Sequence, residues 1–222
     1  MNTVYIADIS NYSKDEADKY REWLSHERKE RLDRFRRQED YMRSLIGDVM
    51  VRSLFGKITG RPPYEAEILY GRHKKPYFRG GKPFFFNISH SGRYVVCAVS
   101  ESPCGVDIEE IASADRLLAE SVCSDNEKKY LLSFTDGDYD REFFRLWTLK
   151  ESYVKYVGEG LYMELKSVSF ADDSCKLINR NEDKDLFFFS DFFPEGYVLS
   201  VCGNGKFRVE NFDAEQNTKY QE

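Results

Sequence analysis

One order of elements occurs twice along this chain, at an interval of about 100 residues, and this repeat restricts the possible folds more than any other feature. Each half contains a long segment with the pattern of a helix, which ends at a pair of glycines and is followed by short apolar segments of strand length. The long segments span residues 40–54 and 140–157, and the glycine pairs are Gly56 with Gly60 and Gly158 with Gly160.

The predicted strands follow each long segment in the same order. They span residues 68–70, 84–88 and 94–100 in the first half, and 168–170, 186–189 and 197–202 in the second. The first unit is preceded by a predicted strand at 3–9 and predicted helices at 13–23 and 28–35. The earlier of these helices begins with the capping-box pattern of Ser13 and Glu16.

The last strands of the two units are also alike in sequence, since residues 92–97 read GRYVVC and residues 196–202 read GYVLSVC. We therefore expect an α+β fold made of two similar α/β halves, residues 1–102 and 103–222. These halves would pair as an intramolecular pseudo-dimer. A crevice between two such halves is a natural place for an active site.

The composition is that of an ordinary globular protein, because 41% of the 222 residues are hydrophobic and 32% are charged. The longest apolar runs, such as residues 95–99, are far shorter than the roughly 20 residues that span a bilayer. The N-terminus lacks the basic and apolar stretches of a secretory signal. The five cysteines include no C-x-x-C pair, so neither a disulfide framework nor a zinc site is expected. We expect a cytoplasmic protein with reduced thiols and no membrane partner.

The net charge of −6 argues against nucleic acid as a partner, because phosphate backbones are bound through clustered positive charge. Two windows are nevertheless basic. Residues 28–37 carry six Arg or Lys against two acids, and residues 71–82 carry five against none. Such windows suit a compact polyanion, although a solvated helix face and a solvated loop are the commoner explanations.

The segment at 105–109, GVDIE, places two carboxylates on one face of a strand. Period-two alternation puts Asp107 and Glu109 on one side and Val106 and Ile108 on the other. Two adjacent carboxylates repel each other, and a hard cation such as Mg²⁺ between them removes the repulsion. Taken alone, the pattern is more typical of the solvent-facing edge of a strand.

The segment at 146–155, LWTLKESYVK, aligns Trp147, Glu151 and Lys155 at i, i+4 and i+8 on one helix face. A third carboxylate here could complete a metal site, and the neighbouring ammonium could neutralise a phosphate oxygen. Without further context, a core tryptophan beside a surface ion pair is the simpler interpretation.

The segment at 86–92, FNISHSG, ends a predicted strand with two hydroxyls, an imidazole and a turn-forming glycine. These groups are suited to holding phosphate. They do not form a nucleophile elbow, because no G-x-S-x-G pattern surrounds Ser89 or Ser91. A turn with a structurally satisfied His90 explains the pattern equally well.

Together, these segments resemble the ordered motifs of the surfactin-type (Sfp-type) 4'-phosphopantetheinyl transferases. The matching motifs are Lys75-Pro76, residues 86–91, residues 105–109 and residues 147–155, in the same order across nearly the whole chain. The resemblance implies a monomer of two similar halves that binds coenzyme A and Mg²⁺ between them. It also implies transfer of the 4'-phosphopantetheine arm of coenzyme A to a serine of an apo acyl or peptidyl carrier protein, with release of adenosine 3',5'-bisphosphate.

The resemblance further implies the roles of particular residues. Asp107, Glu109 and Glu151 would hold Mg²⁺, with Mn²⁺ as an open alternative. Glu151 would accept the proton of the carrier serine, directly or through water, and Lys155 would neutralise the phosphate under attack. The residues implied to contact coenzyme A are Arg28, Arg31, Arg43, Lys75, Ser89, His90, Lys150 and Lys155.

Two other functions fit the same residues. One is a Mg²⁺-dependent phosphodiesterase or nuclease, because D-x-E with a nearby lysine also serves phosphodiester cleavage, although the net negative charge speaks against it. The other is a non-catalytic coenzyme A binding module with structural carboxylates. The negative charge also fits poorly with an acidic carrier protein, so docking is expected to use local basic residues and apolar contacts from residues 112–122 and from the segment after Gly158.

Overall fold

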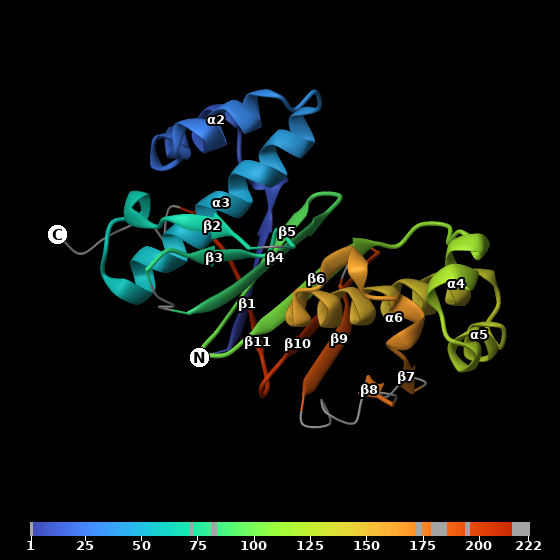
Figure 1. Ribbon diagram of the computed structural model, residues 1–222. Helices are drawn as coiled ribbons and strands as arrows, with labels where there is room; N and C mark the ends of the chain where they lie inside the picture. The colour runs from blue at the N-terminus through green and yellow to red at the C-terminus, as the bar shows by residue number, and fades with distance from the viewer. Residues whose placement is uncertain are drawn as a thin grey trace.

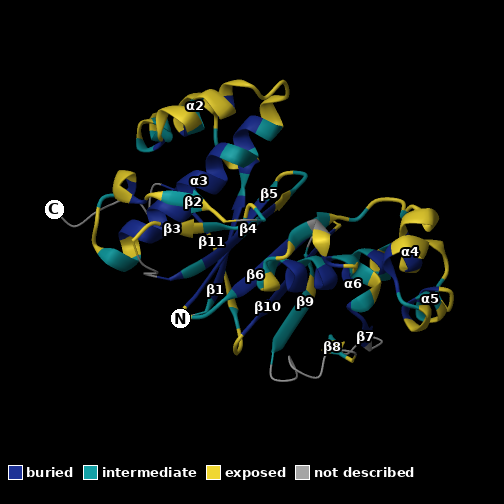
Figure 2. Ribbon diagram, in the orientation of Figure 1, coloured by how far each residue is buried: buried dark blue, intermediate teal, exposed yellow. Residues whose placement is uncertain are grey.

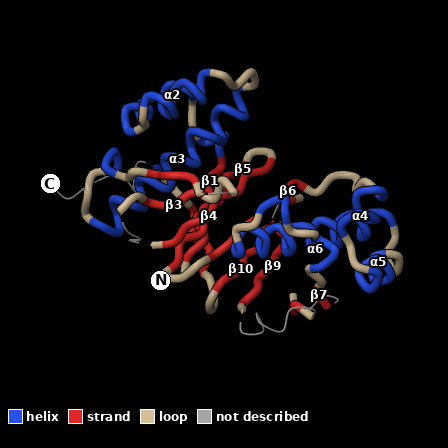
Figure 3. The backbone as a smooth tube through the Cα atoms, viewed as in Figure 1, coloured by secondary structure: helices blue, strands red, loops and turns tan. Residues whose placement is uncertain are grey.

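The computed structural model describes residues 2–71, 73–80, 84–171, 175–178, 186–193 and 196–214 (Figure 1). Part of the basic window at 71–82, namely Arg72, Gly81 and Lys82, lies outside the described residues. The chain forms two halves, each with a long helix packed on a β-sheet (Figure 3). The predicted α+β class with two similar halves is therefore confirmed.

The sheet of the N-terminal half has the strand order β11-β1-β5-β4. Its strands are β1 (Thr3–Asp8), β4 (Phe85–Ser91), β5 (Tyr94–Ser100) and β11 (Arg208–Asn211). The helices of this half are α1 (Lys14–Asp18), α2 (His26–Asp33) and α3 (Gln38–Thr59), with short 3-10 turns at Ile9–Asn11, Lys19–Trp23 and Pro63–Glu65. A separate hairpin joins β2 (Ile68–Tyr70) to β3 (Pro76–Phe78).

The sheet of the C-terminal half has the strand order β6-β10-β9. Its strands are β6 (Cys104–Glu110), β9 (Phe187–Phe193) and β10 (Tyr197–Gly203). The helices are α4 (Arg116–Val122), α5 (Asp125–Leu131) and α6 (Asp136–Val157), with 3-10 turns at Gly160–Tyr162 and Leu165–Ser167. Strands β7 (Phe170–Ala171) and β8 (Lys176–Leu177) pair with each other. Of the strand predicted at 168–170, only Phe170 lies in a strand, because Val168 and Ser169 connect the 3-10 turn to β7.

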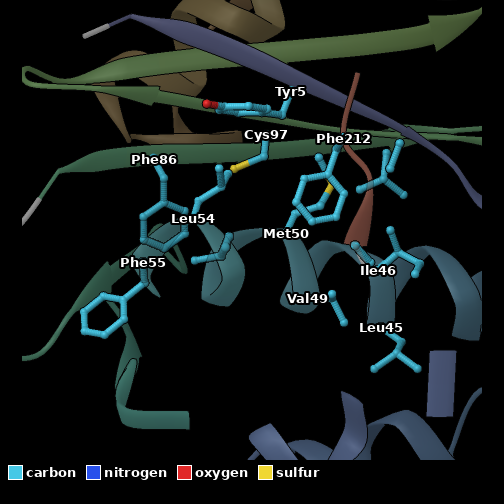
Figure 4. Packing of buried hydrophobic residues seen from close by; sticks show 14 of the residues in the cluster. Tyr5, Leu45, Ile46, Val49, Met50, Leu54, Phe55, Phe86, Cys97 and Phe212 are labelled. Atoms are coloured by element: carbon cyan, nitrogen blue, oxygen red, sulfur yellow. The ribbon is translucent and has the colours of Figure 1, made fainter. Parts of the chain in front are cut away.

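Each half has its own core, and a third core joins the halves (Figure 2). The first lies between α3 and the N-terminal sheet, where Ile46, Met50 and Leu54 point toward the strands (Figure 4). The second lies beneath α6. The third contains side chains from both sheets, including Val4, Ile6, Val96, Val106 and Ile108. This shared apolar layer holds the halves together, because burying apolar surface stabilises an interface as it stabilises a core.

The two sheets meet where β4, the edge strand of one, lies beside β6, the edge strand of the other. After β10 the chain returns to the N-terminal half, where β11 pairs in parallel with β1 and adds a strand to the N-terminal sheet. This differs from the expected division at residue 102, which assigns all of 103–222 to the second half. No helix among the described residues is both long and apolar enough to cross a membrane.

Candidate active site

The contact between β4 and β6 brings two predicted motifs side by side. The Ser89 hydroxyl donates to Asp107 Oδ1 at 2.7 Å, and the Ser91 hydroxyl donates to Glu109 Oε2 at 2.7 Å. Asn87 Oδ1 accepts the backbone N–H of Val106 at 2.9 Å. These side-chain hydrogen bonds connect the two halves along the edge where their sheets meet.

The predicted alternation along β6 is confirmed. Val106 and Ile108 are fully buried in the core that joins the halves, whereas Asp107 and Glu109 point to the opposite face. Gly105 shares that face, and a side chain there would lie 2.0 Å from the carbonyl oxygen of Ser152 in α6. Helix α6 therefore packs closely over the face that carries the carboxylates, because residue 105 has no side chain to keep it away.

Helix α6 runs along β6 and presents the predicted stripe to it. The Lys155 ammonium donates to Asp107 Oδ1 at 2.6 Å and to the Ser89 hydroxyl at 2.9 Å. The Trp147 indole donates to the Glu109 carboxylate, two helical turns away from Lys155. Glu151 lies between them, close enough to Asp107 and Glu109 to feel both charges. The sheet contact and the helix thus bring Ser89, Asp107, Glu109, Glu151 and Lys155 into one cluster.

The electrostatics of this cluster show an excess of negative charge. Burial and the charge of Asp107 raise the pKa of Glu151 above its ordinary value. Burial, with the charge of Asp107, also raises the pKa of Glu109, although the Ser91 hydroxyl opposes this. Lys155 is the cation that lies against these acids. The cluster of Asp107, Glu109, Glu151 and Lys155 thus carries a net negative charge, which a bound cation would reduce.

The structure allows a test of whether a metal ion fits here. No three His, Cys, Asp or Glu side chains in the described part of the chain stand in an arrangement that could hold a metal ion. Asp107 Oδ2, however, is buried and has no hydrogen-bond partner among those residues. Buried carboxylate oxygens are normally paired with a donor or a cation. Carboxylate oxygens such as those of Asp107, Glu109 and Glu151 are the ligand type that Mg²⁺ prefers, so the donor chemistry fits such an ion, although the three side chains do not converge on one point in this structure.

Arg43, one of the predicted basic residues, lies at the same C-terminal end of β4 as the carboxylate cluster. Arg43 donates to the backbone carbonyl of Gly92, in the turn directly after His90. The Arg28 guanidinium reaches α3, where it donates to Asp48 at 2.6 Å and to the Ser44 hydroxyl at 2.6 Å. Arg31 is exposed one turn further along α2. The structure thus places Arg43 near His90, and it places Arg28 and Arg31 near Asp48 of α3.

His90 lies between Ser89 and Ser91 at the end of β4. Its imidazole is exposed at the surface. Partial desolvation by the surrounding chain and the nearby charge of Arg43 lower its pKa. The imidazole is therefore mostly neutral at pH 7, where it can donate or accept a hydrogen bond.

Two lysines that were expected to contact coenzyme A, Lys150 and Lys75, have protein groups as partners in the structure. The Lys150 side chain is fully buried, 2.8 Å from the Glu127 carboxylate, and it also donates to the carbonyls of Leu165 and Val168. This ammonium faces the core of the C-terminal half, so the expectation that Lys150 contacts coenzyme A is corrected. The Lys75 ammonium donates to the carbonyls of Lys155 at 2.5 Å and Tyr156 at 2.8 Å, at the end of α6.

Tyr197, which the sequence did not indicate as a residue near the site, contacts the turn after β4. The hydroxyl of Tyr197 in β10 accepts the backbone N–H of Arg93 at 3.3 Å and hydrogen-bonds to Glu110. Any side chain at Gly92 would collide with this hydroxyl, since a Cβ atom there would lie 2.0 Å from it. The available signal in the sequence was the repeat, in which Tyr197 occupies the position equivalent to Tyr94. In the structure the two rings pack edge to face, with their centres 4.8 Å apart.

Chemically, the cluster combines the Lys155 ammonium, two serine hydroxyls, the buried carboxylate of Asp107 and two half-buried glutamates with a raised pKa. Ammonium and metal charge stabilise phosphoryl oxygens, and a carboxylate can accept a proton from an attacking hydroxyl. The arrangement is thus suited to transfer of a phosphate-containing group.

Comparison with known proteins agrees with this chemistry. Residues 103–202 match the family model of the 4'-phosphopantetheinyl transferase superfamily, and residues 11–102 match the model of the N-terminal region of 4'-phosphopantetheinyl transferases. The boundary between these models falls where β5 leads into β6. The two matches therefore correspond to the two halves of the fold, apart from β1 and β11.

Curated relatives give the same result. The chain is 35% identical over 190 residues to a 4'-phosphopantetheinyl transferase of Bacillus subtilis, covering 84% of this chain and 85% of the relative. It is 34% identical to the 4'-phosphopantetheinyl transferase Sfp of Bacillus subtilis strain 168, covering 86% of each. It is 33% identical to the 4'-phosphopantetheinyl transferase gsp of Aneurinibacillus migulanus, covering 81% of this chain and 76% of the relative. With both halves matched and the motifs gathered at one site, the chain belongs to the 4'-phosphopantetheinyl transferase superfamily.

Proposed function

We propose that this protein transfers the 4'-phosphopantetheine arm of coenzyme A to a serine of an apo acyl or peptidyl carrier protein. The observation that carries the proposal is the contact of Lys155 with both Asp107 and Ser89, which unites motifs from the two halves of a transferase-family chain. The alternatives of a nuclease and a coenzyme A binding module are not favoured, because the matching family models and relatives are transferases.

The proposed reaction is a displacement at phosphorus. The serine oxygen of the carrier forms a bond to the phosphorus that bears the pantetheine arm, and the bond from that phosphorus to the bridging oxygen breaks. Adenosine 3',5'-bisphosphate leaves with the bridging oxygen. Glu151 accepts the serine proton, directly or through water, and its raised pKa makes it a stronger base than an ordinary glutamate. Lys155 stabilises the negative charge that develops on the phosphate oxygens.

We further propose that Asp107, Glu109 and Glu151 hold Mg²⁺ or Mn²⁺. The unpartnered Oδ2 of Asp107 and the raised pKa values of both glutamates support this assignment. A bound divalent cation would supply positive charge to the pyrophosphate of coenzyme A. The carboxylates that would hold this cation are themselves held by hydrogen bonds, from Ser91 and Trp147 to Glu109 and from Ser89 to Asp107.

Coenzyme A itself is proposed to lie along β4, from the carboxylate cluster to the arginines. Ser89 and His90 would contact its phosphates, and Arg28, Arg31 and Arg43 would lie near its 3'-phosphate. Arg28 and Arg43 are already oriented by Asp48 and Asp40, so little side-chain entropy remains to be lost on binding. Lys155 would contact the phosphate at the other end.

The carrier protein is proposed to dock on α4, within the segment 112–122. Leu117 is 79% exposed there, which is unusual for a leucine. We expect Leu117→Ser to raise the KM for the carrier roughly 10- to 150-fold, the equivalent of the 1.5–3 kcal/mol gained by burying one leucine. The KM for coenzyme A should not change. Val209→Ser is the control, because Val209 is an exposed apolar residue on β11 of the other half; an equal effect of both variants would contradict docking at α4.

We also propose that the protein acts as a monomer in the cytoplasm. All residues of the cluster come from one chain, so no second copy is needed to complete the site. The five cysteines are free thiols, and Cys97, Cys104, Cys123 and Cys202 among them are buried. These thiols suit a reducing compartment.

Mass spectrometry tests the proposed function. An apo-carrier incubated with the protein, coenzyme A and Mg²⁺ should gain the mass of one phosphopantetheine group, and a chelator should prevent the gain. A carrier whose acceptor serine is replaced by alanine is the control. If no apo acyl or peptidyl carrier gains this mass, the proposed function is wrong.

A further inference from the structure

A loop of the N-terminal half reaches across to the end of α6 in the C-terminal half. The Lys75 ammonium donates to the backbone carbonyls of Lys155 at 2.5 Å and of Tyr156 at 2.8 Å. The last four carbonyls of a helix have no partner within the helix, and a cation there also interacts favourably with the helix dipole. Lys75 therefore caps the C-terminus of α6 from the opposite half of the molecule.

Further contacts surround this cap. Gly158 ends α6 in the left-handed region, with φ of 85°, and a Cβ atom there would lie 3.1 Å from Lys75 Cδ. The ring of His73 packs edge to face on Tyr162, with the ring centres 4.9 Å apart. We call the contact of residues 73–75 with residues 155–162 the clasp. It joins the two halves beside the site but contains none of the carboxylates.

The clasp bears directly on one catalytic group. The carbonyl of Lys155 accepts from Lys75, while the ammonium of the same Lys155 lies at Asp107 and Ser89. Fixing this backbone fixes the origin of the side chain that reaches the phosphate. Misplacement of a reacting group by about 1 Å can cost on the order of 100-fold in rate.

We propose that Lys75 is a positioning residue, which holds the last turn of α6 so that the Lys155 ammonium stands at the phosphate. This role rests on the proposed function and differs from the sequence-based expectation that Lys75 lies against the nucleotide. The two roles have different kinetic consequences. A lost contact with the nucleotide weakens binding and raises the KM for coenzyme A, whereas a misplaced Lys155 lowers kcat.

The test compares Lys75→Met with Lys74→Met. Both changes remove one positive charge and keep an unbranched side chain, and Lys74 is an exposed neighbour whose ammonium is not the one that caps α6. We expect Lys75→Met to lower kcat on the order of 10- to 100-fold and to leave the KM for coenzyme A within roughly twofold. Lys74→Met should match the parent. A raised KM at parent kcat for Lys75→Met would overturn the proposal.

A double-mutant cycle gives a second readout. In a Lys155→Ala background, Lys75→Met should have little further effect, because its effect passes through Lys155. An undiminished loss in that background would show that Lys75 acts independently. If Lys75→Met fails to fold, Tyr162→Ala takes its place, since Tyr162 is 83% exposed and its removal only loosens the clasp. The expected result is then a smaller loss of kcat at unchanged KM.

Hydrogen exchange separates this proposal from the proposed function. The amides of residues 155–160 should exchange faster in Lys75→Met than in Lys74→Met, because the end of α6 loses its cap. This measurement needs no substrate. A parent protein that modifies no carrier would refute the proposed function, whereas equal exchange in the two variants would refute the clasp.

Discussion

Asp107 lies in an environment that its sequence pattern does not predict. It is only 3% exposed, so the solvent-facing strand edge that its sequence pattern suggested is not its environment. Oδ1 accepts from Lys155 and Ser89, whereas Oδ2 is buried without a partner among the described residues. A buried charge that is only partly paired lowers the stability of a fold. The partly paired carboxylate of Asp107 therefore lowers the stability of the fold, and a cation bound beside it would reduce this cost.

Burial of negative charge at this site also predicts that the effect of Glu151→Gln on stability depends on pH. Because the fold raises the pKa of Glu151, the folded state binds more protons than the unfolded state as the pH rises above its ordinary value of 4.5. The parent thus loses stability as the pH rises through the raised pKa. We expect Glu151→Gln to increase Tm by about 2–4 °C at pH 8, the shift that roughly 1 kcal/mol gives in a chain of this size.

The gain should disappear below pH 4.5, where the carboxyl group is protonated in both states. Thermal melts of parent and variant across this range make the measurement. Glu159→Gln is the control for loss of an exposed acid. A gain that is the same at low and high pH would show that burial of the Glu151 charge is not its cause.

The two lysines of the segment 146–155 show what sequence can and cannot resolve at this scale. Lys155 lies on the stripe with Trp147 and Glu151, and its helix position alone predicts that it faces those residues. Lys150 lies about 100° away from Glu151 on the same helix. It therefore points into the core toward Glu127, and no local pattern reveals that partner, since it belongs to another helix.

At the scale of elements, the site depends on how closely α6 approaches β6. A Cβ atom at residue 105 would lie 2.0 Å from the Ser152 carbonyl oxygen and 2.5 Å from the Tyr156 nitrogen. Both atoms belong to the backbone and cannot rotate away. The missing side chain of Gly105 is thus what allows Lys155 and Glu151 to reach the carboxylates.

We therefore expect Gly105→Ala to lower the free energy of unfolding by about 3 kcal/mol or more, the upper range for overpacking. Gly137→Ala is the matched control within α6, because nothing lies within 4 Å of a side chain at that position. It should be neutral or stabilise by up to about 1 kcal/mol. Urea denaturation of both variants decides the matter, and equal midpoints would mean that close packing at Gly105 is unimportant.

Elements with a strong periodic pattern were predicted well. The strand predicted at 94–100 has those bounds, and the helix predicted at 140–157 ends at Val157 as expected. The helix predicted at 13–23 instead divides into α1 and a 3-10 turn. Helices α4 and α5 were not predicted, because each has only seven residues and too few apolar positions to show a period.

At the scale of the whole molecule, the repeat predicted two halves but could not predict the return of the chain. Strand β11 pairs with β1, and Phe212 and Ala214 enter the core of the N-terminal half. Parallel pairing between residues about 200 positions apart leaves no local signal in a sequence. The N-terminal sheet is therefore completed by the end of the chain.

This arrangement predicts that a chain ending at residue 203 is much less stable than one ending at residue 214. The shorter chain lacks β11 and the 5% exposed Phe212. We expect a loss of at least about 3–5 kcal/mol, the usual cost of removing one buried phenylalanine. Urea midpoints of the two chains measure the difference, and similar midpoints would contradict a structural role for β11.

We propose that motifs from both halves form one site for transfer, with Lys155 at the phosphate. The most direct test is the transfer rate of Lys155→Ala at saturating coenzyme A and carrier, with Lys166→Ala as a control for loss of an exposed lysine. We expect Lys155→Ala to lower the rate on the order of 100- to 1,000-fold, as for other groups that stabilise developing charge, and we expect the control to keep the parent rate. A Lys155→Ala protein that transfers phosphopantetheine at the parent rate would contradict this proposal.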